Sequence, residues 1–296
     1  MQHLLSIDQL SQATIMDLIQ QALYFKQSAQ YPQYPFYSLA TLFYENSTRT
    51  RVSFELAGKH LGMPVVNLDV QTSSETKGEI IDDTFQTLMA MGINYMVVRH
   101  PKEGTAARLA SLAKPNVHVV NAGEGQLHHP SQALLDLMTL LEKKPDLKGL
   151  KIAIVGDVLH SRVAQSFQTI AKCMGVGDLV IVAPTHWQPK NLIAGRMTTS
   201  LKEGLSDADA VMCLRVQKER LDRHDAFDLA TYRQHYALTA SALAKAKPDA
   251  LVMHPGPMNR GVEIDADVAD GPQSVILEQV QNGVFMRMAI LDALAK

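Results

Sequence analysis

Strand-like and helix-like segments alternate along the chain, and this alternation constrains the fold more than any other feature of the sequence. Short runs rich in Val, Ile and Leu are separated by stretches whose apolar residues recur with helical spacing. In such chains each helix crosses back over the sheet before the next strand begins, so that neighbouring strands run parallel. The sequence therefore predicts an α/β fold with largely parallel sheets flanked by helices.

The predicted elements fall into two groups. We expect strands at 39–44, 65–68, 94–99, 117–120, 151–157, 179–183, 210–214 and 250–253. Helical patterns are expected after the turn at 47–51 and at 79–91, 161–174 and 274–294. A polar stretch with a proline and a glycine, at 142–149, separates the groups. The chain has 296 residues, of which 46% are hydrophobic, so it is long enough for two domains.

Two helical patterns have a clear apolar face. In 79–91 the residues expected to point inward are Ile81, Phe85 and Leu88. In 274–294 the residues that share one face are Leu277, Val280, Val284, Met288 and Leu291.

Composition excludes several classes of protein. No run approaches the ~18 apolar residues of a membrane-spanning helix. The first eight residues lack the basic and long apolar regions of a signal peptide. The net charge is -2, and no dense basic stripe is present, which argues against nucleic acid as a partner. We therefore expect a cytoplasmic protein that binds neither membrane nor nucleic acid.

The turn at 47–51, Ser-Thr-Arg-Thr-Arg, lies between a predicted strand and a predicted helix. A serine or threonine at this position is usually only a helix cap. Here three hydroxyls and two arginines occur in five residues, beside the free N–H groups and positive end of the helix. This combination favours a phosphate-binding site.

Several common motifs are incomplete or absent. Residues 154–157 resemble the start of a dinucleotide-binding turn, but its second and third glycines are missing, and no phosphate-binding G-x-x-x-x-G-K-[ST] loop occurs. The histidines lack paired metal-ligand spacing, and no G-x-S-x-G motif marks a covalent nucleophile. We expect neither a metal nor a cofactor.

Polar residues also follow other predicted strands at their carboxyl ends, where open α/β sheets bind ligands. Arg99 ends one strand, His129 and Gln132 begin a helical pattern, and residues 254–257 (His-Pro-Gly-Pro) follow the last strand. Each alone has an ordinary explanation, such as a solvated strand end or a helix-initiating turn. Together with the turn at 47–51 they favour a single functional site.

These motifs resemble those of the carbamoyltransferase family in order and spacing. The resemblance rests on Phe43–Arg51, Val98–Pro101, His129–Gln132, and Leu135 with Asp136. Four further segments narrow the resemblance to the family members that use aspartate, namely Lys77–Glu79, Val155–Asp157 with Arg162, Arg215–Arg220 and His254–Pro257. The resemblance extends over the whole chain.

The resemblance implies a fold and a reaction. It implies a carbamoyl-phosphate-binding domain at 1–145 plus 278–296, including a C-terminal helix that returns to it, and an aspartate-binding domain at 146–277. It also implies carbamoyl transfer from carbamoyl phosphate to L-aspartate, in de novo pyrimidine (UMP) biosynthesis. Phosphate is a good leaving group, so this chemistry requires no cofactor.

The resemblance further implies which residues bind carbamoyl phosphate. They are Ser47, Thr48, Arg49, Thr50, Ser73, Arg99, His129, Gln132, Gly256 and Pro257. Of these, Thr50, Arg99 and His129 are expected to be catalytic, since they would face the carbonyl oxygen, where negative charge grows in the transition state. Gln132 and the backbone carbonyls at 255–257 would accept hydrogen bonds from the carbamoyl NH2.

Aspartate would be bound by Lys77, Arg162, Arg215 and Gln217. Planar guanidinium groups match the two carboxylates of aspartate bidentately. Ornithine would instead need acceptors for its ammonium group, and ornithine enzymes usually carry a cysteine in the turn that is His-Pro-Gly-Pro here. An ornithine or related carbamoyltransferase, and a catalytically silent scaffold subunit, remain alternatives.

The resemblance also implies a homotrimer with shared active sites. The loop that carries Ser73 and Lys77 would reach the neighbouring subunit's site, and it has no obvious apolar anchor of its own. A larger assembly with regulatory or dihydroorotase-like chains is left open.

Overall fold

The computed structural model describes residues 1–68, 79–217 and 229–296. The chain forms two compact units, Met1–Leu135 with Val280–Lys296, and Asp136–Gln279. Both divisions fall inside helices, the first in α5 (Pro130–Lys143) and the second in α11 (Ile276–Ala295). The predicted boundary between residues 145 and 146 lies just after α5. The last helix thus ends in the first unit, as the resemblance implied.

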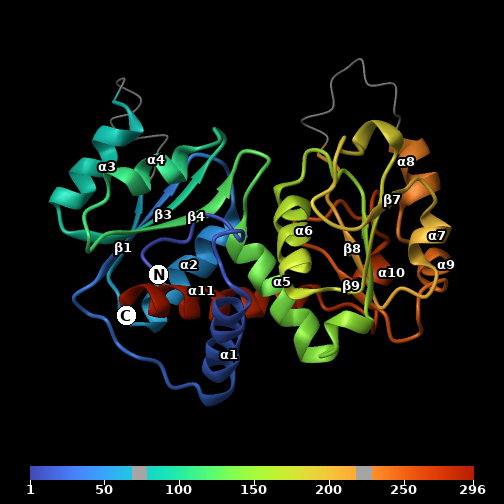
Figure 1. Ribbon diagram of the computed structural model, residues 1–296, viewed down its shortest axis with the longest axis horizontal. Coiled ribbons are helices and arrows are strands. Elements are labelled where there is room, and N and C mark those ends of the chain that lie inside the picture. The colour runs from blue at the N-terminus through green and yellow to red at the C-terminus, as the bar shows by residue number, and fades with distance from the viewer. Residues whose placement is uncertain (69–78, 218–228) are drawn as a thin grey trace. The chain divides into compact units, whose positions relative to one another are not determined.

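A four-stranded parallel sheet forms the centre of the first unit, in the order β2-β1-β3-β4. Its strands are β1 (Ser38–Phe43), β2 (Val65–Leu68), β3 (Ile93–His100) and β4 (His118–Glu124). Besides its parts of α5 and α11, its helices are α1 (Gln12–Ser28), α2 (Thr48–His60), α3 (Ile81–Ala90) and α4 (Thr105–Leu112). Figure 1 shows α3 and α4 on one side of this sheet and α2 and α11 on the other.

The core of the first unit tests the two predicted apolar faces. Ile81, Phe85 and Leu88 of α3 are buried against the sheet, which confirms the first face. The second is wrong at its amino end, because Leu277 and Val280 of α11 are 81% and 45% exposed. Periodicity identifies a face of a helix, but it does not show how far along the helix neighbouring elements cover that face.

The second unit contains a five-stranded parallel sheet in the order β7-β6-β5-β8-β9. Its strands are β5 (Lys151–Val155), β6 (Asp178–Val182), β7 (Arg196–Thr198), β8 (Ala210–Cys213) and β9 (Leu251–Met253). Its other helices are α6 (Arg162–Met174), α7 (Leu201–Leu205), α8 (Leu229–Tyr236), α9 (Ala240–Leu243) and α10 (Ala266–Ala269). Figure 1 shows α6 on one side of the sheet and α7, α8 and α9 on the other.

Both sheets confirm the predicted α/β class with parallel strands. The predictions from the sequence did not include α1, α4, β7 or the helices α7 to α10. Apart from α1, these segments are too short to show a clear periodic pattern. Among the residues that the structure describes, no helix combines the length and apolar character of a membrane span.

The amino-terminal segment pairs with the edge strand β4. The Leu4 backbone N–H donates to the Val119 carbonyl (2.9 Å), and the Val119 N–H donates to His3 Nδ1 (3.1 Å). The His118 ring contacts the Gln2 carbonyl through Nδ1 at 2.8 Å. Burial lowers the pKa of His3 and, opposed by this backbone hydrogen bond, that of His118; repulsion between the two rings lowers the pKa of His3 further.

We predict that acidification from about pH 7.5 to about pH 5.5 lowers the free energy of unfolding. Both histidines bind protons more weakly in the folded state, so the unfolded state takes up more protons as pH falls through about 6.5. The stabilisation is present above that pH and is lost below it. Urea unfolding followed by circular dichroism should show a shallower pH dependence for His118→Asn than for the unmodified chain.

The exposed His235 of α8 provides the control, since His235→Asn removes a histidine without touching β4. Identical pH dependence in the unmodified chain and His118→Asn would contradict the prediction.

Candidate functional site

In the first unit the strand order reverses beside β1, which has β2 on one side and β3 on the other. Open α/β sheets bind ligands at the carboxyl ends of the strands where the order reverses. The predicted turn at 47–51 follows β1, and Arg99 lies near the end of β3, opposite Phe43 in the parallel register. The fold therefore brings the predicted turn and Arg99 to one edge of the sheet.

The amino end of α2 is not capped by its own first side chain. Within the described residues Ser47 makes no capping hydrogen bond, whereas Ser11 accepts one at 3.1 Å from the first turn of α1. Thr48 and Arg49 are exposed, while Thr50 is buried. The first N–H groups of a helix and its positive end attract an anion. This end of α2 is therefore suited to binding a phosphate group.

The Arg99 side chain contacts both β4 and the loop that follows β1. Its Nη1 donates to the Ala122 carbonyl of β4 at 3.3 Å, and its Nε lies 3.4 Å from Glu45 Oε2. The Arg99 carbonyl accepts from the Tyr44 N–H at 2.9 Å, which ties the residues after β1 to β3. These contacts orient a half-buried guanidinium beside the turn that precedes α2.

His129 and Gln132 lie where the chain enters α5. The His129 carbonyl accepts from the Gln132 N–H at 3.0 Å, and both side chains are largely buried. The turn that leads to His129 is closed by the Glu124 N–H, which donates to the His128 carbonyl at 2.9 Å. The Glu124 carboxylate in turn accepts N–H groups of Gly104 (2.9 Å) and Ala106 (2.7 Å) at the start of α4. Glu124 thus anchors two loops at this edge of the sheet.

In the second unit the strand order reverses beside β5, between β6 and β8. Gly156 follows β5 with φ at +131°, and a β-carbon there would lie 3.1 Å from the Leu214 carbonyl oxygen. A glycine is required for this close approach of two strand ends. This explains why residues 154–157 resemble a dinucleotide-binding turn although its later glycines are missing.

The two arginines predicted to bind aspartate follow β5 and β8. Arg162 is the first residue of α6 and Arg215 follows the end of β8, and both are half-buried. An arginine in the first turn of a helix opposes the helix dipole, so Arg162 does not stabilise α6 through the dipole. Gln217 Nε2 donates to the His160 carbonyl at 3.2 Å, which joins the two loops. The His160 ring contacts the buried Asp157 carboxylate at 2.9 Å.

The turn at 254–257 follows β9 and is also held from within the second unit. His254 is buried, its Nδ1 accepts from the Gly256 N–H at 2.8 Å, and its Nε2 lies 3.3 Å from Glu263 Oε1. Gly256 has φ at +65°, a conformation that favours glycine, and the Gly256–Pro257 bond is cis. Burial, with the Glu263 charge nearby, raises the pKa of the Cys213 thiol at the end of β8. A neutral thiol is a poor nucleophile.

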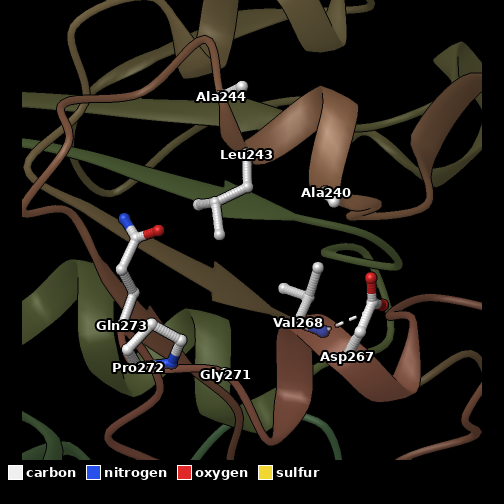
Figure 2. A pocket seen from close by; sticks show the side chains of 8 residues that line it. All are labelled: Ala240, Leu243, Ala244, Asp267, Val268, Gly271, Pro272 and Gln273. Atoms are coloured by element: carbon white, nitrogen blue, oxygen red, sulfur yellow. Dashed lines mark hydrogen bonds between the residues drawn. The ribbon is translucent and has the colours of Figure 1, made fainter.

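Two predicted site residues, Ser73 and Lys77, lie outside the described ranges, so their predicted contacts stay predictions. A cavity of about 230 Å³ in the second unit contains no predicted site residue; it is lined by Ala240, Leu243, Ala244, Asp267, Val268, Gly271, Pro272 and Gln273 (Figure 2). The described residues hold no cluster of His, Cys, Asp and Glu suited to a metal ion.

Three buried or half-buried carboxylates at these edges were not assigned a role from the sequence, namely those of Glu45, Glu124 and Glu263. Glu45 lies inside the motif 43–51, so its position beside the turn could have been noticed. Glu263 lies nine residues after His254 in a segment without periodicity, and no sequence signal indicated it.

The chain matches known family models over nearly its whole length. Residues 2–142 match the model described as aspartate/ornithine carbamoyltransferase, carbamoyl-P binding domain. Residues 148–294 match the model described as aspartate/ornithine carbamoyltransferase, Asp/Orn binding domain.

Individual relatives agree with these models. The aspartate carbamoyltransferase catalytic subunit of Legionella pneumophila (strain Corby) is 59% identical over 294 residues, 99% of each chain. Aspartate transcarbamoylase from Trypanosoma cruzi, solved with carbamoyl aspartate and phosphate, has a TM-score of 0.90 at 30% identity, covering 100% of this chain and 96% of that one. Ornithine carbamoyltransferase from Pyrococcus furiosus has a TM-score of 0.87 at 28% identity, covering 98% and 96%.

The open end of α2 leads to a prediction about phosphate. Arg49→Ala should weaken the binding of inorganic phosphate about tenfold to a hundredfold, because a charge-assisted contact is lost. Isothermal titration calorimetry at low ionic strength measures this directly. Lys59→Ala removes a positive charge from the other end of the same helix and should leave the affinity nearly unchanged. Equal affinities in all three proteins would rule out the α2 site.

Proposed function

The chain belongs to the aspartate/ornithine carbamoyltransferase family, and on that premise we propose that it transfers the carbamoyl group of carbamoyl phosphate to the amino group of L-aspartate. The products are N-carbamoyl-L-aspartate and phosphate, as in pyrimidine biosynthesis. The observation that carries this proposal is the 59% identity, over 99% of both chains, with a catalytic subunit named for the aspartate reaction.

Carbamoyl phosphate binds through the first unit in this proposal. The N–H groups at the start of α2, with the side chains of Ser47, Thr48 and Arg49, hold the phosphate. The open helix end and the exposed position of Arg49 support this role. Arg99, which its contacts with Glu45 and Ala122 hold in place, reaches both phosphate and carbonyl oxygen.

Catalysis depends on charge that develops at the carbonyl oxygen. The aspartate nitrogen attacks the carbamoyl carbon, a tetrahedral intermediate forms, and the carbon–oxygen bond to phosphate breaks. Phosphate leaves with the electron pair and accepts the proton that the amine releases. Thr50, Arg99 and His129 donate hydrogen bonds to the oxygen and stabilise the transition state more than the ground state. Gln132 and the carbonyls of the turn at 255–257 accept from the NH2 and fix its orientation.

Aspartate binds through the second unit. Arg162 and Arg215 lie on the two loops that the Gln217–His160 hydrogen bond joins, so their guanidinium groups can act on one ligand. Two arginines match the two carboxylates of aspartate, whereas an ornithine ammonium would be repelled by them. These arginines favour the aspartate reaction over the ornithine alternative, which the fold alone does not distinguish, since both kinds of enzyme have the same fold.

We further propose a homotrimer in which Ser73 and Lys77 complete the neighbouring subunit's site. The family resemblance supports this arrangement. Aspartate and carbamoyl phosphate together carry several negative charges, which an additional lysine helps to neutralise. A cytoplasmic location is also part of this proposal. A larger assembly with regulatory or dihydroorotase-like chains is left open.

The substrate assignment predicts a selective response to aspartate. The purified chain should release phosphate from carbamoyl phosphate when aspartate is added, and not when ornithine is added. Arg162→Ala and Arg215→Ala should each raise the aspartate KM about tenfold to a hundredfold, because a charge-assisted contact is lost. Arg196→Ala is the control, since this exposed arginine of the same unit pairs with Asp178 and Glu203 instead. An unchanged aspartate KM in both variants would sink the assignment.

The shared site predicts complementation between inactive subunits. Arg49→Ala and Lys77→Ala homotrimers should each be nearly inactive, because each lacks one positive charge in every site. Mixing them after dissociation should restore part of the activity, since some sites then combine an intact Arg49 with an intact neighbouring Lys77. Native mass spectrometry identifies the mixed trimers, and steady-state assays measure their activity. Verified mixed trimers that are no more active than their parents would reject the shared site.

A further inference from the structure

Glu263 is a fully buried carboxylate in the second unit. Its contacts reach both the segment that follows β8 and the turn that follows β9. Its side chain and that of His254 are 0% exposed. Burial of a charged carboxylate is unfavourable unless several donors surround it. Glu263 and the groups that donate to it therefore hold one another in place.

The donors come from three separate places in the chain. Glu263 Oε1 accepts from the Asn259 backbone N–H and lies 3.3 Å from His254 Nε2. Its Oε2 accepts from Asn259 Nδ2 at 3.1 Å and from the Val216 N–H at 3.5 Å. Asn259 Nδ2 also donates to the Val216 carbonyl at 3.1 Å, so the carboxylate holds the backbone N–H of Val216 and the amide holds its backbone carbonyl.

The position of the histidine ring proton follows from this pattern. His254 Nδ1 accepts from the Gly256 N–H, so the ring proton is on Nε2 and points to Glu263. A neutral histidine and an ionised carboxylate satisfy all these contacts. Replacement of the Glu263 carboxylate by an amide would place a donor against a donor.

The residues next to these donors are those to which the proposed function assigns substrate contacts. Val216 lies between Arg215 and Gln217, which are assigned to aspartate. His254 and Asn259 lie on either side of Gly256 and Pro257, which are assigned to the carbamoyl NH2. A buried carboxylate that only stabilised a turn would have no need to reach the segment after β8.

We propose that Glu263 is a positioning residue for carbamoyl transfer. It holds the Arg215–Gln217 segment and the turn at 254–259 in one fixed arrangement, so that aspartate binding and the orientation of the carbamoyl group depend on each other. This inference rests on the proposed function and adds a residue that contacts neither substrate.

The test is Glu263→Gln, which keeps the shape of the side chain and removes its charge. We expect the aspartate KM to rise about tenfold and kcat to fall about tenfold, because the two contact sets lose their common anchor. Inhibition by inorganic phosphate should change by no more than about twofold, because the phosphate contacts are assigned to the first unit. Glu263→Asp, which retains the charge, should recover part of the lost kcat/KM.

Asp209 offers a matched control in the same unit. It too is a buried carboxylate that accepts a backbone N–H, from Lys151 at 2.9 Å, and it pairs with Lys247 at 2.7 Å. It directly precedes β8, at the opposite end of the strands from Glu263. Asp209→Asn should lower Tm. It should leave the KM values for aspartate and for carbamoyl phosphate within about twofold of those of the unmodified chain.

The outcomes separate the two proposals. An unmodified chain that does not carbamoylate aspartate overturns the proposed function itself. Normal activity in that chain, together with unchanged kinetics in Glu263→Gln, overturns only the role of Glu263, even if Tm falls as in Asp209→Asn. If Glu263→Gln does not fold, Asn259→Ala takes its place, because it removes the amide between Glu263 and Val216. An unchanged aspartate KM in Asn259→Ala then overturns the inference.

Discussion

A parallel sheet whose strand order reverses must send its two crossover connections to opposite faces, and the loops on either side of the reversal diverge at the carboxyl ends of the strands. Both sheets of this protein have such a reversal, beside β1 and beside β5. The positions of the turn at 47–51 and of Arg99 depend on the first reversal, and the positions of Arg162 and Arg215 depend on the second. Residues that are far apart in the sequence become neighbours because of this topology rather than because of local pattern.

The loops at these edges are held mainly by buried carboxylates. Backbone N–H groups that leave regular structure must still find acceptors, and a carboxylate can satisfy several at once. Glu124 accepts two N–H groups at the start of α4, and Glu263 accepts N–H groups after β8 and β9. Buried charges of this kind tolerate few alternative arrangements, so the loops keep one conformation in which substrates can be oriented.

The sequence predicted those parts of the fold and the candidate site that depend on local residue patterns, and it missed those that depend on contacts between distant residues. The turn at 47–51 and Arg99 were identified because strand ends can be read from short apolar runs, and the structure places them at one edge of the sheet. Glu263 was not identified, because its partners lie up to 47 residues away and share no pattern with it. The exposed Leu277 shows the same limit, since helical periodicity carries no information about the neighbours of a helix.

The order of the two units along the chain has a consequence for synthesis. The second unit is one uninterrupted stretch, whereas the first closes only with residues 280–296. Side chains of these last residues form hydrogen bonds with the earlier part of the unit. Asn282 Oδ1 accepts from Lys26 Nζ at 2.8 Å, and Asp292 Oδ1 accepts from the Tyr34 hydroxyl at 2.5 Å. Arg287 Nη2 donates to Ser131 Oγ at 3.4 Å. As the chain leaves the ribosome, the part that begins first is therefore completed last, after the second unit has all of its residues. Until then, the apolar surface that α11 covers is exposed to solvent and available to a chaperone.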